Sequence, residues 1–190
     1  MKKVLIFASG SGTNAENIII HSQKSNLFGV QAVCCNNPNA LVLEKAKKQN
    51  IPTFVFDKND VLLGKLTQKI NEFCPDLIVL AGFLWKFPEE IVLQYPNRII
   101  NVHPALLPQY GGKGMYGMRV HRAVFDNHET ETGITIHFVN ENYDEGQIIF
   151  QEKVSITDCL GPEDIAVKIH ELEQQFFPIV IEAILSKMTS

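Results

Sequence analysis

Two polar side chains stand two residues apart in Asn101-Val102-His103-Pro104, at the end of a short apolar run. Because side chains alternate along a strand, Asn101 and His103 are predicted to point to the same face. An amide and an imidazole at one centre suit acid–base chemistry, in which the amide binds an oxygen and the imidazole moves a proton. Pro104 ends the strand, and the carboxyl ends of strands are where open α/β sheets bind ligands.

A second polar pair, Thr135 and His137, lies two residues apart in the run TIHFV, and an acidic loop, residues 140–146, follows it. A carboxylate near an imidazole raises the pKa of the imidazole and holds one tautomer. Asp144 is therefore a candidate partner for His103 or His137. The same loop is equally consistent with a hairpin turn whose acidic side chains are solvated. The residues alone do not distinguish this turn from a partner of the histidines.

The glycine-rich segment SGSGTN, residues 9–14, lies between a first apolar run and a first helical pattern. Glycines let the backbone approach an anion, and a helix N-terminus presents unpaired N–H groups. The segment is therefore a candidate phosphate site, with side-chain contacts from Ser11, Thr13 and Asn14. It is neither a dinucleotide fingerprint, which needs glycine in place of Ala15, nor a Walker A loop. The alternative is a turn in which Thr13 or Asn14 only caps the helix.

Short Val- and Ile-rich runs alternate with helical patterns over the first hundred residues. This alternation is typical of βα units with a parallel sheet buried on both faces. The fold class is therefore α/β, an open, mostly parallel twisted sheet with helices on both faces. Strands are predicted at residues 4–8, 30–35, 53–56, 77–81 and 99–102, and helices at 14–24, 40–49, 61–73 and 89–95.

The pattern changes after Pro104, where glycine-rich residues predict a loop up to Gly117. Apolar residues at steps of three and four after Gly161 and Pro162 predict a long last helix, kinked at Pro178. No repeat or linker interrupts the chain, so a single domain, residues 1–190, is expected. The other elements predicted here are a helix at 119–127 and two strands at 132–139 and 147–154 that pair as a hairpin.

Composition and charge exclude several classes of protein. Seventeen Lys and Arg against 21 Asp and Glu, interspersed along the chain, lack the basic surface of a nucleic-acid binder. No apolar run approaches the roughly 20 residues of a membrane span, and the apolar start is too short for a signal peptide. Four cysteines without a CxxC pair indicate reduced thiols in a cytoplasmic protein. The six histidines show no ligand spacing, so no metal is expected.

Five motifs occur in an order and spacing that resembles the glycinamide ribonucleotide formyltransferases of purine synthesis, a folate-dependent family with a Rossmann-like fold. The motifs are SGSGTN, LAGF, NVHPALLP, TIHFV and DEG, and the resemblance runs from Lys3 to about Leu185. It implies transfer of the formyl group of 10-formyltetrahydrofolate, a co-substrate, to the amine of 5'-phosphoribosylglycinamide. It also implies a phosphate-binding half, about residues 1–100, and a folate-binding and catalytic half, about 101–190. Small-molecule substrates and a monomer or homodimer are expected, with no nucleic acid or membrane partner.

The resemblance also implies residue roles. His103 is the catalytic acid/base, Asn101 binds the formyl oxygen, and Asp144 raises the pKa of His103, while Thr135 and His137 line the same centre. The ribotide-binding residues are Gly12, Thr13, Asn14, His170 and Glu173. The folate-binding residues are Leu84, Trp85, Lys86, Phe87, Asn101, Asn140, Glu141, Asn142, Tyr143 and Asp144.

The chain departs from the family pattern in three places. Trp85 replaces a basic residue that is usual just after LAGF, and the glycine-rich stretch 110–118 is longer than in the common bacterial form. The arginine that helps to hold the folate glutamate tail has no clear counterpart between Phe56 and Leu66. Lys58 is the candidate replacement.

Three other functions compete with formyl transfer to the ribotide. Formyltetrahydrofolate hydrolase has the same Asn, His and Asp in its site but carries a further N-terminal domain. Methionyl-tRNA formyltransferase needs a further tRNA-binding domain and a basic surface. Neither is expected for 190 residues with a net charge of -4. A non-catalytic module that binds a phosphorylated metabolite would keep Gly12 to Asn14 but has no need for Asn101, His103 and Asp144 together.

Overall fold

The computed structural model describes residues 1–188, and within them seven strands form one sheet in the order β3-β2-β1-β4-β5-β6-β7. Strands β1 to β5 pair in parallel, whereas β6 pairs antiparallel with both β5 and β7. The predicted open, mostly parallel sheet and the predicted hairpin are therefore confirmed. The strands are β1 (Lys2–Ala8), β2 (Phe28–Cys35), β3 (Thr53–Val55), β4 (Leu77–Leu80), β5 (Ile99–His103), β6 (Glu131–Phe138) and β7 (Ile148–Ser155).

The helices follow the predicted order except at one point. The single helix predicted over residues 61–73 is wrong, because two helices occupy this region. Asp57 starts the first with a capping box, and Gly64, at φ 70°, separates it from the second. The last helix continues through Pro178. The helices are α1 (Thr13–Ser22), α2 (Leu41–Lys48), α3 (Lys58–Leu62), α4 (Lys65–Phe73), α5 (Glu89–Gln94), α6 (Met118–Asp126) and α7 (Pro162–Lys187).

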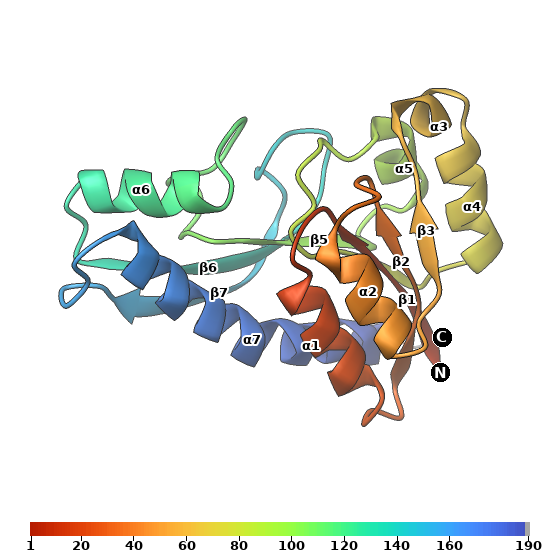
Figure 1. Ribbon diagram of the computed structural model, residues 1–190, viewed down its shortest axis with the longest axis horizontal. Helices are drawn as coiled ribbons and strands as arrows, with labels where there is room; N and C mark the ends of the chain where they lie inside the picture. Colours follow the sequence, from red (N-terminus) through yellow and green to blue (C-terminus); the bar gives the residue numbers. More distant parts are fainter. Residues whose placement is uncertain (189–190) are drawn as a thin grey trace.

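Alternation along β1 divides the core into two layers. Val4, Ile6 and Ala8 pack with α1, α2, α6 and α7 on one face of the sheet. Leu5 and Phe7 face the other side, where α4 and α5 cover them. Figure 1 shows α1, α2 and α7 together and α3 to α5 grouped apart from them. Because helices cover both faces, polar groups that meet a substrate are left to the carboxyl ends of the strands.

The loop between β6 and β7 is held tightly against the end of β6. A Cβ on Gly146 would collide with the carbonyl oxygen of Phe138, so only glycine allows this approach. The acidic loop therefore folds back over the strand end, which brings Asp144 to His137.

None of the helices within residues 1–188 combines the length and apolar character needed to cross a bilayer.

Candidate active site

A cavity of about 480 Å³ opens at the carboxyl ends of β1, β4 and β5. The glycine-rich segments, the loop after β6 and one side of α7 complete its wall. Among the residues predicted for the site, those that line it are Gly12, Thr13, Asn14, Leu84, Trp85, Lys86, Phe87, Asn101, His103, His137, Asn140, Asn142, Tyr143, Asp144, His170 and Glu173.

The register of β5 and β6 brings the two polar pairs together. Asn101 lies opposite His137, and His103 lies opposite Thr135. Asn101 and His103 both line the cavity, so the prediction that they share a face is confirmed. The cross-strand pairing, which sequence spacing did not predict, makes His137 a neighbour of Asn101.

The bonds of His137 define its tautomer. Nδ1 lies 2.8 Å from the backbone oxygen of Phe138, which can only accept, so Nδ1 carries the proton. In the neutral ring Nε2 then accepts from the Asn101 amide nitrogen, 3.2 Å away. This bond orients Asn101 and leaves the second amide hydrogen free for another acceptor.

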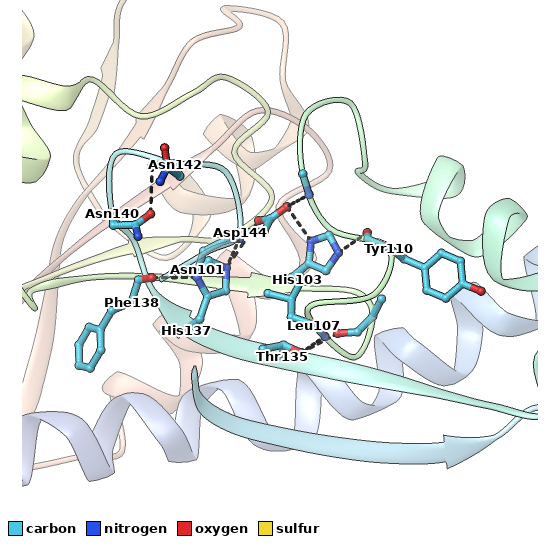
Figure 2. A network of polar contacts seen from close by, with 12 residues as sticks. Asn101, His103, Leu107, Tyr110, Thr135, His137, Phe138, Asn140, Asn142 and Asp144 are labelled. Atoms are coloured by element: carbon cyan, nitrogen blue, oxygen red, sulfur yellow. Dashed lines mark hydrogen bonds and ion pairs between the residues drawn. The ribbon is translucent and has the colours of Figure 1, made fainter. Parts of the chain in front are cut away.

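His103 lies between a loop carbonyl and a carboxylate (Figure 2). Its Nε2 donates to the backbone oxygen of Tyr110 at 2.8 Å, and its Nδ1 lies 3.6 Å from Asp144 Oδ2. The proton that His103 gains and loses therefore belongs to Nδ1, on the side of Asp144. Burial holds the pKa of His103 below its usual value, while the charge of Asp144 and the Tyr110 carbonyl act in the opposite direction.

Asp144 contacts both histidines and the glycine-rich loop. Its Oδ1 lies 3.6 Å from His137 Nε2, and its Oδ2 accepts from the Gly112 N–H at 2.9 Å. Burial acts to raise the pKa of Asp144, but the hydrogen bonds and the charge of His103 outweigh it and hold the pKa below its usual value. The carboxylate is therefore ionised at neutral pH and favours the charged form of His103.

Thr135 does not lie where the resemblance implies. It is fully buried and outside the lining of the cavity, because its hydroxyl supports the turn that follows β5. The hydroxyl donates to the Ala105 carbonyl at 2.7 Å and accepts from Leu107 N–H and from Gln151, each at 2.9 Å. Thr135 therefore holds the backbone next to His103 and has no free group for a substrate.

Glu141 also differs from the expectation. Its side chain is exposed and does not line the cavity, whereas the other residues predicted in this loop do. Asn140 instead folds the loop, because its side-chain oxygen accepts from the Asn142 N–H at 3.0 Å. The loop therefore presents amides and Asp144 to the cavity and turns Glu141 to solvent.

At one end of the cavity, α1 begins with an open N-terminus. Gly12 is the N-cap residue at φ 70°, and no side chain caps the helix. The reading in which Thr13 or Asn14 caps this helix is therefore wrong. Free N–H groups at the start of a helix favour an anion.

The first turn of α1 is joined to α7 at the same place. The Asn14 amide donates to Glu173 Oε2 at 2.8 Å, and His170 Nδ1 lies 3.7 Å from that oxygen. The hydrogen bond to Glu173 raises the pKa of His170. All five residues predicted to bind the ribotide therefore lie along one wall of the cavity.

Replacing Gly12 by alanine is expected to weaken phosphate binding here. A Cβ would collide with Val42, and the left-handed backbone itself disfavours alanine by roughly 1–2 kcal/mol. Relief of the collision and the strain must shift the loop and its N–H groups, and we expect the Michaelis constant for a phosphorylated substrate to rise about tenfold or more, which corresponds to about 1.4 kcal/mol of lost binding.

Gly64→Ala is the matched control, because Gly64 has the same φ of 70° but no atom within 4 Å of an added Cβ. It lies outside the cavity, so this variant lowers the melting temperature without changing the Michaelis constant. An unchanged Michaelis constant in Gly12→Ala would contradict a phosphate site at the start of α1.

Another part of the cavity wall contains aromatic side chains. Leu84 to Phe87 line it, and Lys58 Nζ lies 5.8 Å from the centre of the Trp85 ring. Trp85 and Lys86 also line a second cavity of about 220 Å³, together with Lys58 and Phe56. Apolar walls with a cation at the rim suit a flat ring system that carries an anionic tail.

Sequence reasoning did not identify His121 or Tyr110. His121 lies on α6, is buried and lines the cavity, and its Nδ1 has no hydrogen-bond partner within residues 1–188. Burial holds the pKa of His121 below its usual value. The only sequence signal was a histidine on the buried side of the helix, beside Val120 and Val124.

No group of three His, Cys, Asp or Glu side chains within residues 1–188 is arranged to hold a metal ion.

The sequence and the fold are similar to known proteins. The family model described as formyl transferase matches residues 2–181. The chain is 36% identical to the chloroplastic phosphoribosylglycinamide formyltransferase of Arabidopsis thaliana, over 96% of this chain and 65% of that protein. It is 32% identical to the phosphoribosylglycinamide formyltransferase of Escherichia coli, over 94% of this chain and 84% of that protein. The crystal structure of phosphoribosylglycinamide formyltransferase from Bacillus halodurans superposes on this structure with a TM-score of 0.88. The two sequences are 35% identical, and the match covers 99% of this chain and 97% of the Bacillus halodurans chain.

Proposed function

The chain belongs to the formyl transferase family, and we propose that it transfers the formyl group of 10-formyltetrahydrofolate to the amine of 5'-phosphoribosylglycinamide. The product is formylglycinamide ribotide, in de novo purine biosynthesis. The observation that carries the proposal is the place of Asn101, His103 and Asp144 in one cavity, between an open helix N-terminus and an aromatic wall. The similarity to phosphoribosylglycinamide formyltransferases supports the same choice of acceptor.

The two ends of the cavity match the chemistry of the two substrates. The ribotide phosphate binds at Gly12, Thr13 and Asn14, and His170 and Glu173 contact the rest of the ribotide. A volume of about 480 Å³ lies within the usual range for small-molecule sites. This placement directs the glycinamide amine toward His103.

The folate binds against another part of the cavity lining. Its ring system lies against residues 84–87 and the loop residues Asn140, Asn142, Tyr143 and Asp144. Trp85 stands where the family usually has a basic residue. Lys58 and Lys86, which lie beside Trp85, provide the positive charge for the glutamate tail instead. The glutamate carboxylates thus meet ammonium groups at the rim.

The reaction requires that the negative charge on the formyl oxygen be stabilised and that a proton be transferred between the two nitrogens. When the amine nitrogen attacks the formyl carbon, negative charge develops on the formyl oxygen, and one donor already in place there contributes about 3 kcal/mol. The free amide hydrogen of Asn101 and the imidazolium of His103 are such donors. The His103 imidazolium gives a proton to the leaving folate nitrogen, and the neutral ring that results takes the proton that the amine loses.

An assay with both substrates tests the proposal. We expect formylated ribotide to form at the rate at which 10-formyltetrahydrofolate is consumed. Formate release that is independent of the ribotide would instead indicate the hydrolase. Ribotide binding in calorimetry, without turnover, would favour the non-catalytic module. The cytoplasmic location and the monomer or homodimer stay predictions.

A further inference from the structure

We propose that Tyr110 and Glu129 are positioning residues for His103 and Asp144. The hydrogen bond between the Tyr110 hydroxyl and the Glu129 carboxylate holds the loop backbone in the place where it binds both side chains. The inference rests on the proposed function for its kinetic test, and on the geometry of the loop for its structural test.

Tyr110 connects the centre of the site to the far end of α6. Its backbone oxygen accepts from His103 Nε2 at 2.8 Å, and its hydroxyl donates to Glu129 Oε1 at 2.6 Å. Figure 2 shows the carbonyl turned toward the His103 ring and the phenol ring pointing away from it. Glu129 follows α6, and its N–H donates to the Val124 carbonyl at 3.3 Å. One residue therefore joins the catalytic imidazole, through its backbone, to the turn that follows α6, through its hydroxyl, and Glu129 in that turn is not part of the cavity lining.

The loop around Tyr110 needs such an anchor. Tyr110 has φ 56°, a left-handed backbone that is uncommon for a residue other than glycine, and two glycines follow it. Glycines leave the segment many other conformations, which ordering of the loop must exclude. The hydroxyl–carboxylate bond and the packing of the half-buried ring against the core provide that restraint.

The same segment binds Asp144. The Gly112 N–H donates to Asp144 Oδ2 at 2.9 Å, and a Cβ on Gly111 would lie 2.5 Å from Leu107 and 3.3 Å from the Cβ of Asp144. The backbone thus packs directly on Asp144, so a shift at Tyr110 also moves the donor to Asp144. The Tyr110–Glu129 contact therefore sets the positions of both partners of His103.

By placing the Tyr110 carbonyl, the Tyr110–Glu129 hydrogen bond also decides which nitrogen of the neutral His103 ring carries the proton. With the Tyr110 carbonyl at Nε2, the neutral ring keeps its proton there and presents the Nδ1 lone pair to Asp144. The other charged and titratable groups that face His103 are His137, Glu173 and, from α6, His121. Within residues 1–188 no hydrogen bond or ion pair joins these three groups to Tyr110 or Glu129, so loss of the Tyr110–Glu129 bond removes none of their polar contacts.

Kinetics of three single variants and one double variant test the inference. We expect Tyr110→Phe and Glu129→Ala each to lower kcat roughly tenfold, as for one lost hydrogen bond, with the KM for the ribotide within about twofold of the parent. Glu129→Gln keeps an acceptor for the hydroxyl and restores kcat to within about threefold. The double variant Tyr110→Phe, Glu129→Ala loses no more than either single variant, because both remove the same bond.

Tyr95→Phe is the matched control. It removes a tyrosine hydroxyl that donates to Asn71 at 2.9 Å between α5 and α4, outside the cavity. Its kcat stays at the parent value although its melting temperature falls. A parent-like kcat in Tyr110→Phe, or a Glu129→Gln variant as slow as Glu129→Ala, would overturn the inference.

A measurement without turnover separates this inference from the proposed function. In histidine-¹⁵N-labelled protein, the neutral His103 ring is expected to be protonated at Nε2 in the parent and in Tyr95→Phe. In Tyr110→Phe it becomes a mixture of tautomers, and its pKa falls because the carbonyl that raises it has moved. The same tautomer and pKa in Tyr110→Phe would overturn the inference even in an active enzyme. Altered values in a protein without formyl transfer would refute only the proposed function.

Discussion

Replacing His103 by alanine is expected to lower kcat by roughly 10²- to 10⁴-fold, the usual contribution of a positioned acid or base. The variant loses the group that delivers a proton to the leaving nitrogen and then takes one from the amine. It also loses one of two donors for the oxygen that becomes negative. Steady-state kinetics with both substrates, with calorimetry of ribotide binding, measures the change.

Ribotide affinity should stay within about threefold of the parent in this variant, because an interaction made only during the reaction affects kcat rather than binding. The phosphate site at Gly12 to Asn14 and the contacts of Glu173 lie on other elements. His21→Ala serves as the control, since His21 lies outside the cavity, with its Nε2 3.2 Å from Glu182 Oε2. Near-normal turnover in folded His103→Ala would refute the role of His103.

The second large effect is expected for Asp144→Asn, with kcat reduced on the order of 10²-fold. Asparagine has nearly the same shape and tolerates the left-handed backbone of Asp144, at φ 56°. Its side-chain oxygen still accepts from the Gly112 N–H. The variant therefore removes the negative charge beside His103 and His137 and little else.

The direction of the pH effect in Asp144→Asn follows from the charge. Burial lowers the pKa of His103 and the Asp144 carboxylate raises it, so removal of the carboxylate lowers the pKa further. The imidazolium is then lost at a lower pH than in the parent. The alkaline limb of the kcat profile, which follows that loss, should move toward lower pH.

Two measurements decide whether Asp144 acts through charge. Titration of His103 by NMR should show a lower pKa in the variant, and the pH profile should shift in the same direction. A profile and a His103 titration that match the parent would mean that Asp144 does not tune His103. Ribotide affinity is again expected to change little.

Regular elements were predictable because their signals are local. The alternation of side chains along a strand predicted the shared face of Asn101 and His103, whereas the division of the core into two layers was seen only in the structure. The glycine-rich turn between a strand and a helix was also visible in the sequence, but whether Thr13 or Asn14 capped the helix was left open until the structure showed no side-chain cap. Helix boundaries were less accurate, as the break at Gly64 shows.

Side chains that lie in loops or bond to them were predicted less well, since their role depends on contacts distant in the sequence. Thr135 alternates in phase with His137, yet the turn after β5 takes its hydroxyl, and no local pattern reveals that partner. Glu141 and Asp144 belong to one acidic loop, but only Asp144 is turned inward, by the Gly112 N–H and the two histidines.

The amino-acid pattern was enough to predict an α/β sheet with an amide and an imidazole at one strand end and a phosphate site at another. The tautomer of His103, the pairing of Asn101 with His137 and the anchor from Tyr110 to Glu129 came only from the folded chain. The physical reason is the range of the interactions. Periodicity acts between residues two to four apart, whereas Tyr110 and Glu129 are 19 apart and Asn101 and His137 are 36 apart. Such pairs meet only when the sheet and the loops have closed around them.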